Sequence, residues 1–140
     1  MNISKFTQKS IEAVNNLEKV AYQFGHQEIE EEHLLYSLLH QEDSLIAKLI
    51  EKMEIQKEHF MDNAERHLAA RVKVSGGQVY VGQDLNKVLI HAEDEAKQMG
   101  DEYVSVEHLF LALIKYPNKA LKEIFKEYGI TREPVSYTHP

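Results

Sequence analysis

One segment of this chain is written twice, 75 residues apart. Residues 28–39 read EIEEEHLLYSLL and residues 103–114 read YVSVEHLFLALI, and in both the Glu-His-Leu triplet stands seven residues after a glycine. Between residues 21–39 and their partners, seven positions are identical and most of the others keep their character. A repeat that cannot bury its apolar face alone gains a core by docking on its copy. The duplication therefore predicts two similar halves that share one core.

The segment before each glycine has the apolar spacing of an amphipathic helix. In the first half this spacing predicts a helix over residues 11–24, with Thr7 ahead of it as the N-cap and Gly25 as its stop. The copy predicts a helix over residues 85–99 that ends at Gly100. Each half thus opens with one long helix.

The Glu-His-Leu triplet predicts the start of a second helix in each half. A third, short helix follows Ser44 in the first half and Pro117 in the second, where the fixed φ of proline suits a first helical turn. Residues 56–72 are typical of a fourth helix, which joins the halves. Residues 72–82 hold adjacent glycines among alternating valines, so a loop is predicted there, with a short hairpin as the alternative.

Composition narrows the classes of function. A net charge of -7 opposes binding to a nucleic-acid backbone, which draws its affinity from Lys and Arg. No apolar run approaches the ~20 residues that a bilayer needs, so no membrane partner and a cytoplasmic location are expected. The absence of Cys excludes disulfides, thiolate metal sites and cysteine nucleophiles.

No motif for catalysis or metal binding stands out. The eight histidines include no HExxH pair, and no GxxxxGK[ST] phosphate loop occurs. His33 and His108 are expected to be neutral structural histidines in a first helical turn, bonded to nearby backbone. For Glu32 and its counterpart Glu107, helix capping and an intermolecular contact both remain open. The chain is therefore expected to be no enzyme, with no metal and no cofactor of its own.

Three motifs together resemble a known family. These are the doubled Gly-x-x-x-[Ile/Val]-x-x-Glu-His-Leu pattern, FTQKSIEAV near the start, and VYVGQDLNKVL before the second unit. They are similar to the N-terminal domain of Clp-type AAA+ unfoldases, and DLNKVLIHAEDEAKQMGDEYVSVEHLFLAL resembles its ClpB disaggregase branch. The resemblance covers residues 1 to about 131.

The resemblance implies an all-α domain of two pseudo-symmetric four-helix repeats. Repeat one would span about residues 1–71, the loop residues 72–82, and repeat two about residues 83–131. The tail, residues 132–140, departs from the helix with which the family continues, and its Pro134 would break one, so the tail is expected to lie outside the domain and to be disordered or non-native.

The resemblance also implies a function. Such a domain captures unfolded or aggregated proteins, and in some relatives adaptor proteins, for an AAA+ motor that uses ATP and Mg and is not in this chain. The isolated domain is expected to be a monomer and the parent a hexamer. In the ClpC branch the matching rim recognises phosphorylated arginine, and Thr7 with Glu32 would form one such pocket here.

The expected client site has a groove wall and a polar rim. The wall would be Tyr80, Val81, Leu85 and Leu89, and the rim Thr7, Asp101 and Glu107. A purely structural alternative, in which these residues cap helices and fill the core, stays open. Where the second repeat of the family carries Ser or Thr, this chain has Gly82, so a polar pocket there loses its hydroxyl.

Overall fold

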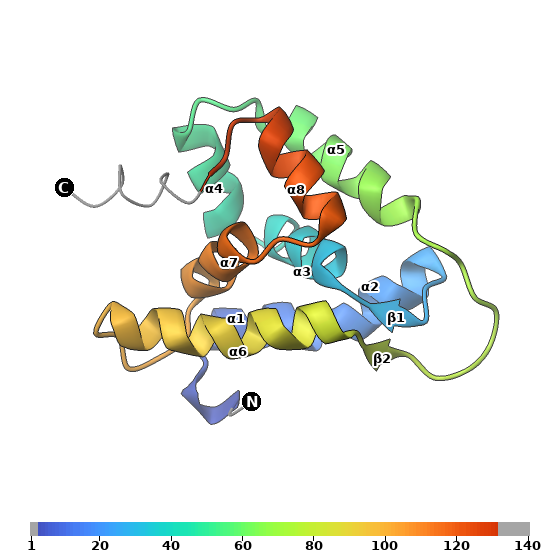
Figure 1. Ribbon diagram of the computed structural model, residues 1–140, viewed down its shortest axis with the longest axis horizontal. Helices are drawn as coiled ribbons and strands as arrows, with labels where there is room; N and C mark the ends of the chain where they lie inside the picture. Colours follow the sequence, from blue (N-terminus) through green and yellow to red (C-terminus); the bar gives the residue numbers. More distant parts are fainter. Residues whose placement is uncertain (1–2, 132–140) are drawn as a thin grey trace.

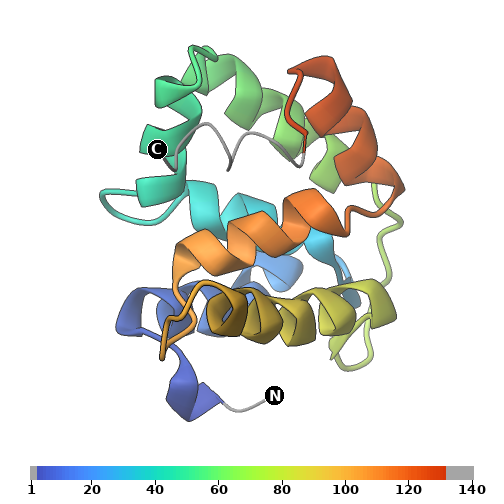
Figure 2. The ribbon, with the colours of Figure 1, turned by 60° about the vertical axis from the view of Figure 1, so that its left-hand side comes forward.

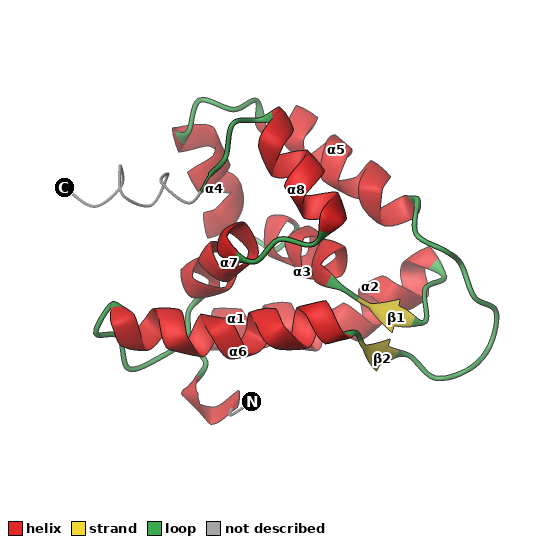
Figure 3. Cartoon of the chain, in the orientation of Figure 1, coloured by secondary structure: helices red, strands yellow, loops and turns green. Residues whose placement is uncertain are grey.

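The computed structural model describes residues 3–131, which form a helical domain with one pair of very short strands (Figures 1 and 3). Repeat one contains η1 (Ile3–Lys5), α1 (Gln8–Asn15), α2 (Leu17–Phe24), β1 (Glu28–Ile29), α3 (Glu31–Leu39), α4 (Leu45–Lys52) and α5 (Lys57–Ala69). Repeat two contains β2 (Tyr80–Val81), α6 (Gln83–Gln98), α7 (Val106–Lys115) and α8 (Lys119–Glu127). The all-α fold class expected from the sequence is confirmed, while the expected tail lies outside the described residues.

The helices stack in three tiers, seen most clearly in Figure 2. The helices that begin with Glu-His-Leu, α3 and α7, occupy the middle tier, with α1, α2 and α6 on one side and α4, α5 and α8 on the other. Buried apolar residues of both repeats join in one cluster, which includes Leu34 and Phe60 of repeat one and Leu89 and Leu113 of repeat two. Within residues 3–131, no helix is long and apolar enough to cross a membrane.

The first helix of repeat one is broken where its copy is continuous. The sequence predicts a single helix to Gly25, but α1 ends at Asn15 and α2 begins at Leu17. Asn15 and Asn16 stand at the break, and asparagine favours local side-chain bonds over a helix interior. In repeat two, α6 runs unbroken through the equivalent positions.

The short third helices have the expected caps, with one shift. Ser44 caps α4, its hydroxyl accepting a hydrogen bond from the Ala47 N–H at 3.1 Å. The cap of α8 is Asn118, whose side-chain oxygen accepts from the Leu121 N–H at 3.0 Å. The sequence predicted that Pro117 lies in the first turn of this helix. Pro117 instead precedes the cap.

Short strands of one repeat pair with strands of the other, an arrangement called here the strand exchange. β1, in the link before α3, pairs in parallel with β2, just before α6, with Glu28 opposite Tyr80 and Ile29 opposite Val81. The symmetric position holds a parallel bridge between Phe6, before α1, and Val104, before α7. Residues 72–79 contain no strand, and β2 pairs with β1, so the short hairpin considered as an alternative for residues 72–82 does not form. The segment is a loop that leads into a strand of the other repeat's link.

Candidate functional site

The acidic run after β1 caps helices of the opposite repeat. Glu30 Oε1 accepts a hydrogen bond from the Leu85 N–H at 2.9 Å and Oε2 from the Asp84 N–H at 3.3 Å, at the start of α6. Glu31 Oε1 accepts from the Asn118 N–H at 3.0 Å, at the start of α8. Carboxylates are stabilised at helix N-termini, where N–H groups lack partners. This run therefore fastens the repeats together.

Arg71, just after α5, joins the same run through two ion pairs. Its Nη1 lies 2.8 Å from Glu32 Oε2, and its Nη2 lies 2.8 Å from Glu28 Oε1. Asn118 Nδ2 donates to the other Glu32 oxygen at 2.7 Å. Burial alone would raise the pKa of the Glu32 carboxyl, but the bonds from Asn118 and Arg71 outweigh burial and hold that pKa below its usual value. Glu32 is thus an ionised internal anchor.

The pKa values of the neighbouring carboxyls, Glu30 and Glu31, are raised and not lowered. Burial raises the pKa of the Glu30 carboxyl, against the opposing hydrogen bond from Leu85. Burial raises the pKa of the Glu31 carboxyl to about 8, and the nearby carboxylates of Glu30 and Asp84 add to the shift. Glu31 therefore holds a proton at neutral pH.

Gly82 makes room for the Glu30 cap. A Cβ on Gly82 would lie 2.0 Å from Glu30 Oε2 and 2.5 Å from Glu30 Cδ, closer than atoms can approach. Its φ of -74° is open to any residue, so space and not conformation requires the glycine. The equivalent pair in the other half is Thr7 and Ser105. The hydroxyl missing at Gly82 is thus replaced by a carboxylate from the other repeat, which the sequence did not indicate.

Both Glu-His-Leu histidines bond to backbone in the first helical turn, as predicted. His33 Nδ1 accepts from the Glu30 N–H at 2.9 Å, and His108 Nδ1 accepts from the Ser105 N–H at 2.9 Å. Each ring thereby satisfies an N–H at the start of its helix. The imidazole takes the part that Glu or Gln plays in a capping box.

The second ring nitrogens differ between the halves. His33 Nε2 lies 2.9 Å from Nδ1 of the buried His26, whereas His108 Nε2 bonds to Asp101 Oδ2 at 2.8 Å. Burial lowers the pKa of His33 to about 4, and the charge of Arg71 and the repulsion that a second proton on the His26–His33 pair would meet add to the shift. Burial also lowers the pKa of His26. The pair in repeat one is therefore neutral, which agrees with the expectation for His33.

The predicted groove wall divides into exposed and buried residues. Tyr80 and Val81 are 53% and 48% exposed, as a binding surface requires. Leu85 and Leu89 are 0% and 3% exposed and belong to the core. Assigning these two leucines to a surface groove was wrong, because they lie on the face of α6 that packs on α7.

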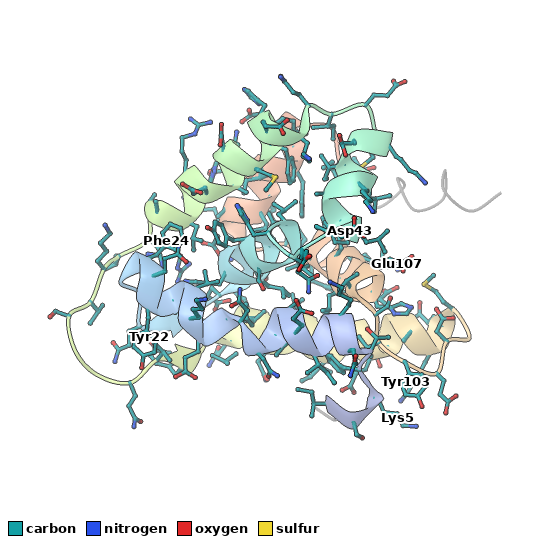
Figure 4. All side chains as sticks on the ribbon, turned by 180° about the vertical axis from the view of Figure 1, so that it is seen from behind. Lys5, Tyr22, Phe24, Asp43, Tyr103 and Glu107 are labelled. Atoms are coloured by element: carbon teal, nitrogen blue, oxygen red, sulfur yellow. The ribbon has the colours of Figure 1, made fainter. Side chains whose placement is uncertain are left out.

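The predicted rim residues lie at the other strand exchange. Thr7 caps α1 by accepting from the Ser10 N–H at 3.2 Å, and its own N–H donates to the Val104 carbonyl at 2.9 Å. Asp101 is bonded to His108. Glu107 is exposed at the start of α7, at the end of the molecule that also carries Tyr103 and Lys5 (Figure 4). These residues do not adjoin Tyr80 and Val81 through any hydrogen bond of the described chain.

The alternative pocket of Thr7 with Glu32 is not found. The two residues share no hydrogen-bond partner within residues 3–131. The Glu32 side chain is 4% exposed and already holds the guanidinium of Arg71. The guanidinium of Arg71 thus occupies the position beside Glu32 that the guanidinium of an arginine ligand would need.

Two surface depressions lie at the paired strands β1 and β2, and a third lies beside them between the end of α5 and the start of α8. Their volumes are about 400, 560 and 550 Å³, and Arg71 lines all three. Val72, Val74 and Tyr80 line the first, and Tyr80 and Val81 line the second. The sequence did not indicate Arg71 or Val74 as site residues, because helical spacing cannot show which loop folds beside a helix end. Among residues 3–131, no cluster of His, Asp or Glu is arranged to hold a metal ion.

Comparison with known proteins identifies the family. The family model described as "Clp repeat (R) N-terminal domain" matches residues 5–128. The chain is 42% identical over 141 residues to the chaperone protein ClpB of Nitratidesulfovibrio vulgaris strain Hildenborough, covering 96% of this chain. It is 33% identical over 138 residues to ClpB of Clostridium tetani, covering 95% of this chain. In both cases the chain spans 16% of the relative's length.

Solved structures show the same fold. The Hsp104 N-terminal domain from Candida albicans has a TM-score of 0.81 at 24% identity, covering 95% of this chain and 87% of that one. The N-terminal domain of the ClpV1 ATPase from E. coli EAEC Sci1 T6SS has a TM-score of 0.79 at 19% identity, covering 99% and 85%. The family-model match over residues 5–128 and the identity to the two ClpB proteins show that the chain belongs to the Clp repeat N-terminal domain family.

Proposed function

We propose that this chain is the client-binding domain of a ClpB-like protein disaggregase. It would capture apolar segments of unfolded or aggregated proteins and pass them to an AAA+ motor elsewhere in the parent. The motor, with its ATP and Mg, and a hexameric parent in the cytoplasm are parts of this proposal that rest on the similarity to ClpB. The domain itself would be monomeric.

The observation that carries the proposal is a group of exposed apolar side chains beside the strand exchange. Val72 is 81% exposed and Val74 44%, and Tyr80 and Val81 follow in the same segment. Arg71 and Glu28 border them with charge. Contiguous exposed apolar groups rimmed by polar residues are typical of protein interaction sites. Such a shallow site fits segments of many sequences with modest affinity.

The proposal is tested by NMR titration with an unfolded protein, such as a reduced and alkylated protein that lacks stable structure. Amide shifts should move in residues 72–82. The double variant Tyr80→Ser, Val81→Ser should weaken binding about tenfold. Leu45→Ser is the matched control, because Leu45 is equally exposed but lies on α4. Equal loss of binding in both variants, or no shift in residues 72–82, would reject this site.

Docking of an adaptor peptide is the second candidate. A ClpV N-domain, with a TM-score of 0.77 and 19% identity, was solved as a complex with a VipB peptide. Here a groove of about 620 Å³ lies between α1 and the end of α3, and its lining includes Ile11, Asn15 and His40. An adaptor should shift the amides of α1 in the same titration. A phosphoarginine ligand would in addition have to displace Arg71 from Glu32.

A further inference from the structure

The backbone of β2 has one side paired and one side turned outward. The Tyr80 N–H donates to the Gln27 carbonyl at 2.9 Å, and the Gly82 N–H donates to the Ile29 carbonyl at 2.8 Å. Alternate residues of a strand direct their N–H and C=O groups to opposite sides. The N–H and C=O of Val81 therefore point away from β1. Strand groups that point outward in this way can pair with another strand.

The symmetric edge in the other half is closed. Phe6 is the counterpart of Val81, and its N–H donates to the Ile3 carbonyl at 3.0 Å, within the turn of η1. Phe6 itself is 4% exposed, whereas Val81 is half exposed. Before β2 the chain forms the open loop of residues 72–79 instead of such a turn (Figure 3). Of the two equivalent edges, at Val81 and at Phe6, only the one at Val81 is therefore open to a partner.

The charges around this edge indicate what the partner carries. Asp84 is exposed just after β2, and Glu28 lies opposite Tyr80 with its side chain 41% exposed. Two cations lie nearby: Arg71 is already bound to Glu28 and Glu32, and the Lys73 side chain lies against Gly25. An added strand would therefore meet apolar side chains along the edge and the Asp84 carboxylate at one end, while Glu28 lies across β2, on β1. Lysine or arginine beside an apolar stretch suits that arrangement.

We infer that an extended client segment binds by adding a strand to the outer edge of β2. The segment is apolar with flanking basic residues, and its backbone pairs with the Val81 N–H and C=O. This inference rests on the proposed client-binding function and specifies its mode. Main-chain pairing would supply affinity that does not depend on the client's sequence, as capture of many unfolded proteins requires.

The test compares two peptides of about nine residues, the length of an ordinary strand. Both alternate valine and threonine between terminal lysines, and one is N-methylated at its central residues so that neither edge can pair. The unmodified peptide should bind, and the N-methylated one should bind about tenfold more weakly or not at all. Equal affinities would overturn strand addition while leaving apolar capture intact.

Amide hydrogen exchange gives a second readout in the native domain. The Tyr80 and Gly82 amides are bonded to β1 and should be protected without ligand. The Val81 amide should gain protection only when the unmodified peptide binds. Unchanged exchange at Val81 in the bound state would overturn the inference.

Variants at Val81 separate backbone from side chain. Val81→Pro removes the outward N–H without touching a bond to β1, so it should fold but lose peptide binding about tenfold. Val81→Thr keeps the N–H and should bind nearly as the parent does. If unfolded protein binds but neither peptide does, strand addition is rejected alone. If nothing binds, the proposed function fails with it.

Discussion

The two Glu-His-Leu helix starts share one backbone device and differ in what surrounds it. His33 and His108 make the same 2.9 Å bond to backbone at their helix starts. Glu32, before His33, is buried and paired with Arg71, whereas Glu107, before His108, is exposed. The hydrogen bond at the helix start is thus common to both halves, whereas the preceding carboxylate is a buried ion-pair partner in one half and is exposed in the other.

The difference arises from the elements that reach each start. In repeat one, Arg71 follows the end of α5 and lies beside the acidic run, and the α6 and α8 termini face the side chains of that run. These contacts make the α3 start the place where the repeats are fastened. The α7 start has solvent on the corresponding side (Figure 4). We expect substitutions at the first start to affect stability and those at the second to leave it almost unchanged.

The largest effect is expected for Gly82→Thr, which gives repeat two the residue that repeat one has at Thr7. The new Cβ would overlap the Glu30 carboxylate, force it from the α6 terminus and leave buried groups without partners. The free energy of unfolding should fall by roughly 3 to 5 kcal/mol, measured by urea denaturation.

A second substitution should recover part of the stability that Gly82→Thr removes. Glu30→Ser in the Gly82→Thr background recreates the Thr7 and Ser105 arrangement of the other half and removes the overlap. It should recover at least half of the lost stability. A Gly82→Thr domain as stable as the parent would show that the Glu30 cap can move at no cost.

Next in size is Arg71→Met, which keeps much of the apolar stem and removes the guanidinium. The buried Glu32 carboxylate would lose its ion pair, and breaking such a pair costs about 3 kcal/mol, the lower end of the usual range because Arg71 is 23% exposed. Arg66→Met on the exposed side of α5 is the control. A loss below about 0.5 kcal/mol for Arg71→Met would mean that water can replace the guanidinium.

An intermediate effect, dependent on pH, is expected for His33→Gln. The folded pKa of His33, about 4, is below its unfolded value of 6.5, so its contribution is complete above pH 6.5 and is lost as the pH falls toward 4. Gln can keep the capping bond but does not titrate. Relative to the variant, the parent should lose about 2 kcal/mol between pH 7 and pH 5. Parallel stability curves of parent and variant would contradict a neutral buried His33.

The smallest effect on stability is expected for Glu107→Gln. The side chain is exposed, so the free energy of unfolding should change by less than about 0.5 kcal/mol. Any loss of client binding in this variant, measured in the same NMR titration, would then report on the predicted rim itself. If Glu107→Gln lowered the free energy of unfolding as much as Arg71→Met does, the α3 and α7 starts would not differ in their contribution to stability.

The sequence predicted the helices and their pairing because these follow from local patterns. Apolar spacing placed α6 and α7, and Ser44 signalled the start of α4. The break at Asn16 was missed, since the apolar spacing continues across it. Periodicity records which residues are apolar, and it is less sensitive to a single interrupted turn.

The site was harder to predict than the fold. Spacing alone could not separate the buried face of α6, with Leu85 and Leu89, from an exposed apolar face. The acidic run could be read as a cap of its own helix, and only the packing of the repeats shows that Glu30 caps α6 instead. Contacts between distant segments carry no local signal, and the junction consists of such contacts.

The strand exchange has a consequence for the order of folding. Residues 28 and 80, and residues 6 and 104, can pair only after most of the intervening chain has been placed. Helices form within microseconds, while closing such long loops carries an entropic cost that local contacts do not share. The paired strands should therefore be absent from early intermediates. A nascent chain released before residue 80 would keep the edge of β1 exposed, itself resembling the unfolded segments that chaperones take up.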